Sequence, residues 1–423
     1  MATVPSQARG ERIVTLDVIR GIAVMGIFSV NIVDFSMIQA AYLNPAGYGG
    51  WHGADGLVWA LNMLFVDGKF RSLFSMLFGA SMLLVIDRAE RSGKSGWTVH
   101  WRRMAVLLAI GAAHAILLWR GDILTLYATT GLVAFLFRKM TVEKLAALGL
   151  SLSLTNLHLL WAFAATLVHQ DLAAHGANPT AEILRNWNAN AGSFFPTAEA
   201  IAADKAIYSG SWLAIVTHEA SGAGQILVNN VLLLPDTLGL MLLGMAAYKS
   251  GFLTGEWTDD RYLWVAMWGI AIGLAGFGGL VAADFATRFY VPLVLGGFMA
   301  AMVPFRLAMA FGYAAAIVLI FRRASDIRAR FAAVGRAAFT NYLGTSLVAT
   351  AVFYGWGLGL YGKVTRAEAW LLVPIVWALM LLWSKPWLDR FNYGPFEWLW
   401  RSLARGKLQP MRKGGGAAAI AAA

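Results

Sequence analysis

The sequence contains no cysteine and few charged residues, and both deficits narrow the classes of protein that it can encode. Without cysteine the chain forms no disulfide bond, zinc–thiolate site, iron–sulfur cluster or catalytic thiol. Charged residues make up 13% of the 423 residues, about half the usual share in a soluble domain, whereas 59% are hydrophobic. Motifs of zinc proteases, ATP-binding loops and serine hydrolases are also absent. These features indicate a membrane protein and give no support to metal catalysis or ATP hydrolysis.

Long apolar runs recur between residues 13 and 387, and each is about 15 to 25 residues long, which suits a helix that crosses a bilayer. The predicted spans are 16–38, 72–86, 104–118, 123–137, 145–168, 225–248, 262–281, a run that follows Arg306 and ends at 321, 337–358 and 370–387. The predicted fold class is all-α, a polytopic membrane helical bundle of about ten transmembrane helices in residues 1–387. A tail, 388–423, follows, and its low-complexity end is expected to be disordered. In the seventh span, Gly269-x-x-x-Gly273 predicts close helix packing.

The distribution of basic residues predicts the topology. The net charge is +11, but Lys and Arg cluster at the ends of apolar runs, as the positive-inside rule describes, so no nucleic-acid partner is expected. Each predicted inner loop is basic and each outer loop is not, which favours an even number of spans with both termini in the cytoplasm. Arg9 and Arg12 resemble the start of a signal peptide, but the run after them is too long for one. Residues 169–224, poor in Lys and Arg, are predicted to form an extracytoplasmic loop or cap.

Polar residues within the predicted spans are candidates for function, because a charge near the bilayer centre costs several kcal/mol. In the first span Asp17, Arg20, Asn31 and Asp34 fall within one stripe about 100° wide. Asp17 and Arg20 are spaced to pair, and Asn31 lies about 16 Å beyond Arg20. The stripe predicts one wall of a cavity or tunnel. The alternative is an interfacial ion pair together with an asparagine that bonds a neighbouring helix.

The third span carries one histidine, His114, in an apolar setting. Arg103, eleven residues earlier, lies within about 20° of the same helix face, and Asp122 follows in the connection to the fourth span. A histidine oriented by a carboxylate is the usual arrangement of a general base. A buried histidine bonded to a backbone carbonyl is an equally supported alternative.

Further polar residues lie in or beside other spans. Lys69 and Arg71, just before the second span, are either interfacial anchors or contacts to an anionic group. Asp236 in the sixth span and Asn341 in the ninth add polarity to the predicted interior. Lys69, Arg71 and Asn341 are therefore candidates for binding a substrate or cofactor.

The order of these residues resembles the YeiB-like family of bacterial inner-membrane proteins. The opening block, from Arg12 to Ile32, contains Asp17-x-x-Arg20-Gly21 and Asn31. The later blocks are Lys69-Phe70-x-x-Leu73-Phe74-x-x-Leu77-Phe78-Gly79, His114-x-x-Leu117-x-x-x-Gly121-Asp122-Ile123-Leu124-x-x-Tyr127, Thr340-Asn341-Tyr342-Leu343 and Gly394-Pro395-x-Glu397-Trp398-x-Trp400-Arg401. The resemblance covers nearly the whole chain, in order, and implies the bacterial inner (cytoplasmic) membrane as its location.

That family is similar to a wider group of transmembrane acyltransferases, which includes heparan-α-glucosaminide N-acetyltransferase and the bacterial surface-sugar O-acyltransferases. These enzymes take an acyl group from cytoplasmic acyl-CoA and place it on an acceptor across the membrane, using a buried histidine. The resemblance implies acyl-CoA, such as acetyl-CoA, as donor. In the heparan enzyme the histidine lies in the first outer loop, where this chain has only His52, whereas the YeiB-like histidine is His114.

The leading hypothesis is therefore an acyltransferase that acts on an acceptor hydroxyl or amine at or beyond the outer face. Arg20 and Arg103 would hold the phosphates of acyl-CoA, and Asn31 would donate to the oxyanion. His114, oriented by Asp122, would deprotonate the acceptor. The expected partners are membrane lipids and a small-molecule, sugar or lipid acceptor, and a homodimer is left open. A transporter or exporter with His114 and Asp122 as a proton relay is the first alternative, and a scaffold or lipid-binding protein is the second.

Overall fold

The structure is a computed structural model that describes residues 13–192, 194–322 and 325–413. These residues fold into helices, with no β-strand in the described ranges beyond a single bridge between Phe391 and Arg412. Arg9 and Arg12, the basic residues of the apparent signal peptide, lie outside the described residues, as does the low-complexity end of the tail from residue 414.

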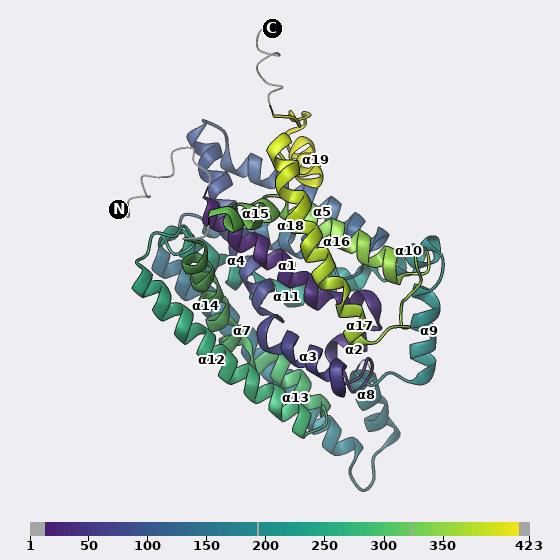
Figure 1. Cartoon of the computed structure of the whole chain (residues 1–423). Helices are drawn as coiled ribbons and strands as arrows, with labels where there is room; N and C mark the ends of the chain where they lie inside the picture. Colours follow the sequence, from purple (N-terminus) through teal and green to yellow (C-terminus); the bar gives the residue numbers. More distant parts are fainter. Residues whose placement is uncertain (1–12, 193, 323–324, 414–423) are drawn as a thin grey trace.

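The helices follow one another from a central first helix to an amphipathic last one (Figure 1). The longer helices are α1 (Val14–Ser36), α4 (Lys69–Arg91), α5 (Gly96–Leu117), α7 (Val142–Ala174), α11 (Ala223–Lys249), α12 (Asp259–Ala286), α14 (Val303–Arg322), α16 (Ala338–Phe353) and α18 (Leu372–Arg390). The shorter ones are α2 (Gln39–Leu43), α3 (Gly53–Phe65), α6 (Leu124–Ala134), α8 (Ala181–Ala191), α9 (Ala198–Tyr208), α10 (Trp212–Ser221), α13 (Val291–Leu295), α15 (Ser325–Arg336), α17 (Arg366–Trp370) and α19 (Pro395–Arg405). A 3-10 turn, η2 (Phe135–Phe137), extends α6, and a π-helical segment, η3 (Gly296–Ala301), follows α13.

Six stretches of the described residues are long and apolar enough to cross a membrane. They are Val14–Ser36, Gly53–Arg91, Ala223–Lys249, Asp259–Ala286, Val303–Arg322 and Arg366–Arg390. The chain is thus a helical membrane protein by the length and composition of its helices. The helices α5, α6, α7 and α16 lie at the other four positions where the sequence predicts a span.

The helix α1 lies in the middle of the molecule and packs against α15 (Figure 1). At the crossing, a Cβ atom on Gly335 would lie 1.8 Å from the carbonyl oxygen of Asp17, and one on Gly21 would lie 2.2 Å from that of Phe331. The two helices therefore touch backbone to backbone, which only glycine allows. The basic stretch that contains α15 is thus a helix packed on α1.

The close packing predicted for Gly269 and Gly273 in α12 is confirmed. A Cβ atom on Gly269 would lie 2.9 Å from the Cα atom of Gly312 in α14, and one on Gly273 would lie 2.6 Å from the Cβ atom of Met309. Small residues let helix backbones approach closely in apolar surroundings, where apolar burial alone does not drive helices together.

The helices α5 and α6 form a hairpin with one short arm. The short arm consists of α6, with 11 residues, and η2, with 3 residues. At 1.5 Å per residue this arm is about 21 Å long, which is less than the roughly 30 Å thickness of the hydrocarbon core of a bilayer. Just beyond η2, the carbonyl oxygens of Arg138 and Met140 accept hydrogen bonds from Lys249 at the end of α11. The short arm is thus level with the end of α11 at one side, and the hairpin tip, residues 118–123, lies within the protein.

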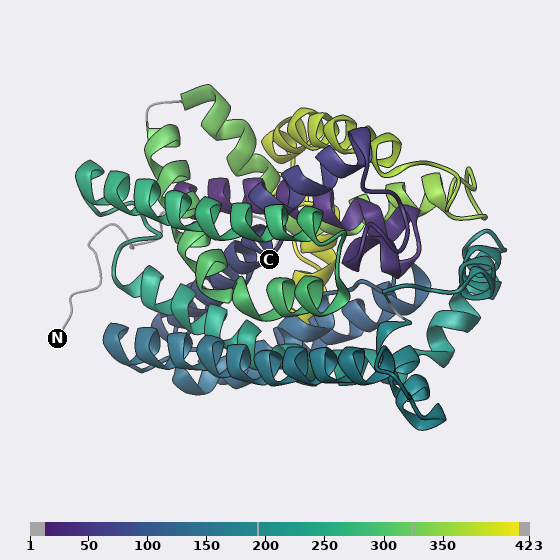
Figure 2. The same cartoon turned by 90° about the horizontal axis from the view of Figure 1, so that it is seen from below.

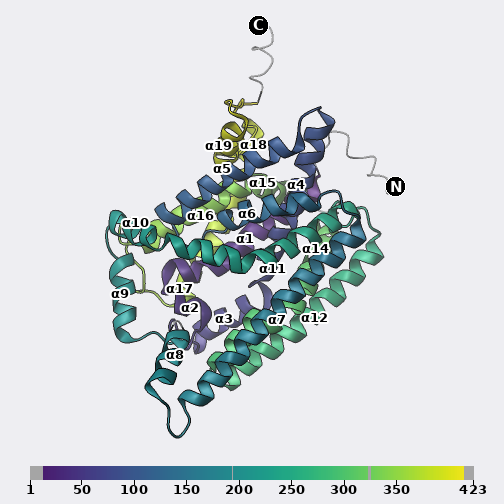
Figure 3. The ribbon, with the colours of Figure 1, turned by 180° about the vertical axis from the view of Figure 1, so that it is seen from behind.

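Residues 169–224, predicted to form a loop or cap, are largely helical. The long helix α7 runs along most of the molecule (Figure 2) and leads into α8, α9 and α10, which follow one another at the end of the bundle away from α19 (Figure 3). Trp212 of α10 donates from Nε1 to the carbonyl oxygen of Leu117, at 2.9 Å. The N–H of Gly355, just after α16, donates to the carbonyl oxygen of Tyr208. We call α8–α10 the cap, because α9 and α10 contact the ends of α5 and α16.

Candidate functional site

His114 and Asp122 form a buried pair at the tip of the α5–α6 hairpin. His114 lies in the last turn of α5, and its Nδ1 atom is 2.9 Å from Oδ1 of Asp122. The other carboxylate oxygen of Asp122 accepts a hydrogen bond of 2.8 Å from the N–H of Thr125 in the first turn of α6. Both side chains are only 1% exposed. The predicted orientation of the imidazole by this carboxylate is confirmed, and the short hairpin explains why residues eight apart can meet.

The second ring nitrogen of His114 has no hydrogen-bond partner among the described residues, although it is buried. A carboxylate at Nδ1 favours the tautomer whose proton is on Nδ1, so Nε2 keeps its lone pair. The rings of Tyr342 and Trp119 flank the imidazole, with centroids 5.3 Å and 6.2 Å from it. The hydroxyl of Tyr342 accepts from the N–H of Ile123 and retains its own proton to donate. An orphan buried acceptor of this kind is costly and suits a group that takes a proton.

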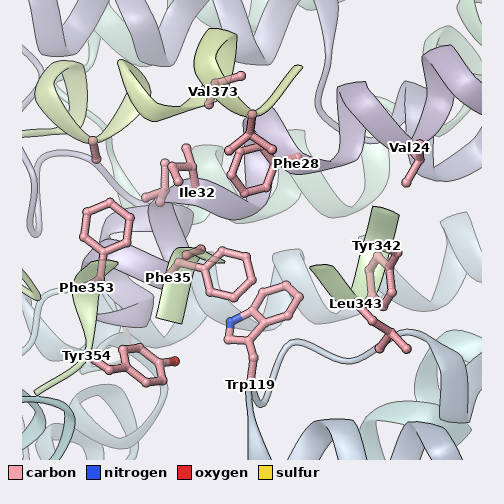
Figure 4. Close-up of a cluster of buried hydrophobic side chains, with 14 of the residues drawn as sticks. Val24, Phe28, Ile32, Phe35, Trp119, Tyr342, Leu343, Phe353, Tyr354 and Val373 are labelled. Atoms are coloured by element: carbon pink, nitrogen blue, oxygen red, sulfur yellow. The ribbon is translucent and has the colours of Figure 1, made fainter. Parts of the chain in front are cut away.

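Apolar side chains surround this pair on the side of α1. Phe28 and Phe35 of α1, Trp119 of the hairpin tip and Leu343 of α16 belong to one buried cluster, drawn in Figure 4. The rings of Phe35 and Trp119 are 4.1 Å apart. The imidazole therefore lies beside an apolar region built from three parts of the chain, which excludes water from it.

Asp34, at the outer end of the predicted polar stripe of α1, connects this helix to the hairpin tip and to the cap. Its carboxylate accepts a 2.9 Å hydrogen bond from Nε1 of Trp119 and lies 3.5 Å from Nη2 of Arg120. Arg120 also donates to the hydroxyl of Tyr208 in α9, at 2.9 Å. That hydroxyl donates to Glu219 of α10. This chain of contacts holds the cap over His114.

The contact between Arg120 and the cap leads to a first prediction. Replacing Arg120 by glutamine removes a charge-assisted hydrogen bond to Tyr208, so local opening of α9 and α10 should become roughly tenfold more frequent or more. Hydrogen exchange of the full chain measures this opening. The exposed Arg185 of α8 is the matched control, because Arg185→Gln removes the same charge without that contact. Equal exchange in the two variants would show that Arg120 does not hold the cap.

The inner end of the predicted stripe is separate from the histidine. Asp17 and Arg20 form the expected ion pair at 2.9 Å, and Arg20 also donates to Ser81 of α4. Asn31 is half-buried in α1, and among the described residues it makes no hydrogen bond to His114 or Asp122. The structure therefore joins α1 to the hairpin through Asp34, and the roles predicted for Arg20 and Asn31 stay predictions.

Arg103 lies on the same face of α5 as His114, about three turns earlier, but its side chain contacts α19. Its guanidinium stacks on the ring of Trp400, at 4.1 Å, and Nε1 of Trp400 donates to the carbonyl oxygen of Arg103. The separation of eleven residues along α5 corresponds to about 16 Å between Arg103 and His114. The C-terminal helix thus positions a cation on the face of α5 that carries the histidine.

Lys69 and Arg71 lie inside the bundle, in the first turn of α4, instead of at its surface. Lys69 is fully buried, donates to the carbonyl oxygen of Met63 and lies over the ring of Phe277. Arg71 pairs with Asp236 of α11, which Arg306 of α14 also contacts. In the sequence Arg306 interrupts an apolar run and has no predicted partner. A lone arginine between two apolar runs was the signal that marks it as a buried partner.

Asn341 connects two helices through its amide. Its Nδ2 atom donates to the carbonyl oxygen of Val334 and to Ser384 of α18, and its Oδ1 atom accepts from Nε1 of Trp383. The amide therefore has partners for its donors and its acceptor within the protein, and its predicted role in substrate binding has no support from these contacts. Among the described residues, no cluster of three or more His, Asp or Glu side chains could hold a metal ion.

Comparison with known proteins places the chain in a family. A profile described as "Protein of unknown function (DUF418)" matches residues 247–407. The chain is 33% identical over 428 aligned residues to uncharacterised protein YxaH of Bacillus subtilis, which covers 98% of this chain and 99% of that protein. It is also 33% identical over 407 residues to uncharacterised protein YeiB of Escherichia coli, with 93% and 96% covered.

A more distant relative is an uncharacterised 39.9 kDa protein of Bacillus acidopullulyticus, which is 25% identical over 404 residues and covers 96% of this chain and 97% of that protein. No solved structure matches the chain. The similarity to YxaH and YeiB extends over nearly the full length of all three proteins. The chain belongs to the YeiB-like family of uncharacterised proteins.

Proposed function

We propose that this protein is a transmembrane acyltransferase whose general base is His114. The main support is the hydrogen bonding of the His114 imidazole. Its Nδ1 atom is bonded to Asp122, whereas its Nε2 atom has no partner among the described residues. A side chain that only packs a helix interface would have both nitrogens satisfied, because an unsatisfied buried polar atom costs about 1–3 kcal/mol. The apolar cluster beside it suits the acyl chain of a donor.

In the proposed reaction Nε2 of His114 takes the proton of the acceptor hydroxyl or amine as its oxygen or nitrogen attacks the thioester carbonyl of acyl-CoA. The new bond joins the acyl carbon to the acceptor, and the carbon–sulfur bond breaks. The proton held on the imidazolium then passes to the CoA thiolate. Asp122 stabilises the imidazolium, and the hydroxyl of Tyr342 donates to the oxyanion that develops on the carbonyl oxygen. The ring of Trp119 must rotate away before reactants reach Nε2.

The donor would enter from the side of α19. Arg103 with Arg401 and Arg405 of α19 concentrates positive charge there, which suits the phosphates of CoA. Arg20 is a weaker candidate for this role, because Asp17 already neutralises it. From Arg103 to His114 is about 16 Å along one helix face, a length that an extended pantetheine arm can follow.

The function is tested with the purified full chain in lipid vesicles supplied with acetyl-CoA on the side of α19. We expect binding at micromolar concentration and slow release of free CoA, with water taking the acyl group because no other acceptor is supplied. A thiol reagent detects the free CoA without interference because the chain has no cysteine. Absence of both binding and release at millimolar acetyl-CoA would refute an acetyl-CoA-dependent activity. The same assay separates this function from transport, since a transporter does not cleave the thioester.

We also propose that the chain crosses the inner membrane ten times, with both termini in the cytoplasm. The support is the agreement of ten helices with ten predicted spans and the basic residues at their predicted inner ends. Introduced single cysteines test it in spheroplasts with a membrane-impermeant maleimide. Glu182→Cys in the cap should react in intact spheroplasts, whereas Lys94→Cys, between α4 and α5, should react only after permeabilisation. The reverse pattern would invert the topology.

A transporter or exporter is the second candidate, favoured by a break within one apolar stretch. The chain turns at Val66–Gly68 between α3 and α4, although Gly53–Arg91 is long enough to cross as one helix. Broken helices often mark substrate sites of transporters. Uptake or release of a substrate by vesicles, with no consumption of acetyl-CoA, would favour this candidate.

A further inference from the structure

Three charged side chains from three helices meet halfway along α11, away from His114. Asp236 is the middle residue of the 27-residue α11 and is buried. Arg71 of α4 contacts one of its carboxylate oxygens and Arg306 of α14 contacts the other, each at 2.5 Å. About 20 Å of helix separates Asp236 from either end of α11, so the cluster lies well inside the length of that helix.

The cluster has more positive charge and more donors than Asp236 can satisfy. Two guanidinium groups face one carboxylate, and the neighbouring Asp67 and Lys69 add one acid and one base, so an excess of one positive charge remains. Nη1 of Arg71 and Nε of Arg306 are buried and have no acceptor within the described protein. An uncompensated charge in apolar surroundings is expensive, so its retention points to a partner that the chain itself does not supply.

Breaks in the neighbouring helices flank the two arginines. Gly68, between α3 and α4, has a positive φ of 73°, and a Cβ atom there would lie 2.8 Å from Cδ of Arg306. The π-helical segment η3 ends just before α14, which carries Arg306 in its first turn. The N-terminus of α4 therefore lies beside Arg71 and Arg306, and its backbone dipole adds to the attraction for an anion. The side chains of Arg71 and Arg306 are 26% and 12% exposed, so a ligand can reach both.

We infer that Arg71 and Arg306 together bind a singly charged oxyanion, a carboxylate or a phosphodiester, at the break between α3 and α4. Guanidinium groups match both anions geometrically, and the charge excess of one selects a monoanion over a doubly charged phosphate. A lipid headgroup or a water-soluble molecule can supply this chemistry. The site uses helices α4, α11 and α14, so it is independent of the proposed acyl transfer at the α5–α6 hairpin.

Thermal unfolding of the purified full chain in a neutral detergent tests the inference. The probes are dioctanoyl phosphatidylglycerol, glycerophosphoglycerol and octanoate, with uncharged dioctanoylglycerol as the control probe. At least one monoanion should raise the unfolding temperature of the wild type saturably, since a ligand of the folded state stabilises it. Phosphatidylglycerol alone identifies a lipid, glycerophosphoglycerol a soluble phosphodiester, and octanoate a carboxylate. No stabilisation by any monoanion overturns the inference.

Substitutions with opposite expected effects on affinity distinguish an anion-binding site from a cluster that only stabilises the fold. Arg306→Gln should weaken the apparent affinity for the monoanion roughly tenfold or more, because a charge-assisted contact is lost. Asp236→Asn should strengthen it, because it frees donors of both arginines. The exposed Arg261 at the start of α12 gives the control Arg261→Gln, which should leave affinity unchanged. If Arg306→Gln does not fold, Arg306→Lys keeps the charge, loses the planar fork and should bind more weakly than wild type. Equal affinities in Arg306→Gln and Arg261→Gln, or weaker binding in Asp236→Asn, overturn the inference.

Discussion

Replacing His114 by glutamine is expected to lower the rate of CoA release from acetyl-CoA about 10²–10⁴-fold, the usual contribution of a positioned general base. Glutamine fills a similar volume and can still bond to Asp122, but its amide has no lone pair basic enough to accept the acceptor's proton. The unfolding temperature should change little, because Nε2 of the wild-type imidazole makes no hydrogen bond that the variant loses. The assay is the release of free CoA, measured beside thermal unfolding of the same sample.

A matched control lies on the same helix. His100 of α5 is also buried, but its Nε2 atom bonds the carbonyl oxygen of Gly131, so it has a structural partner. His100→Gln should therefore reduce stability without a comparable loss of rate. Wild-type activity in His114→Gln would remove the histidine from the reaction. The same conclusion would follow if both variants lost activity in proportion to their loss of stability.

Asp122→Asn should reduce the rate less than His114→Gln does. The amide can still contact the imidazole, but it no longer stabilises the positive charge that forms when Nε2 takes a proton. The loss should therefore appear in the rate of CoA release and leave the binding of acetyl-CoA unchanged, because the charge forms only during the reaction. A rate of CoA release equal to that of the wild type would show that Asp122 only caps α6 through Thr125.

Replacing Gly335 by alanine is expected to destabilise the protein by about 1–3 kcal/mol or more, the cost of overpacking a tight contact. The added Cβ atom would lie 1.8 Å from the carbonyl oxygen of Asp17, which is backbone and cannot rotate away. To accommodate it, α15 must move off α1, the central helix of the molecule (Figure 1). Thermal unfolding of the full chain in one detergent measures the effect.

A second glycine-to-alanine substitution is expected to raise the free energy of unfolding instead of lowering it. Gly278 lies within α12, and nothing is within 4 Å of a Cβ atom placed on it. Gly278→Ala should therefore stabilise the protein by roughly 0.5–1 kcal/mol, because alanine loses less backbone freedom in a helix. If Gly335→Ala stabilised the protein as Gly278→Ala does, the close crossing of α1 and α15 would be disproved.

The helices of this protein are readable from its sequence because each depends on a local property. Apolar runs of membrane length produced the predicted spans, and helices lie at all ten of those positions. Contacts over a few residues were predictable for the same reason. The spacing of Asp17 and Arg20 and the short connection between His114 and Asp122 both specify which side chains can meet, and both pairs form.

The boundaries of irregular segments were less predictable. The sequence predicted an extracytoplasmic loop or cap for residues 169–224 without helices, and three capped helices fill much of it. Thr180, Thr197 and Ser211 are the N-cap residues of these helices, so the local signal was present. These three helices were not predicted because the prediction rests on long apolar runs, and they are neither long nor apolar enough to cross a membrane.

By itself the sequence determined that this is a helical membrane protein, where its long apolar helices lie and which histidine has a carboxylate beside it. Only the tertiary structure decided that Asp34 meets Trp119, that Arg20 turns to Ser81, and that Asp236 is shared between two arginines. The physical reason is that a repeating helical pattern specifies the face on which a side chain lies, whereas its partner depends on which other helix packs there and at what rotation. These partners are between 61 and 165 residues apart in the chain, so no local preference records them.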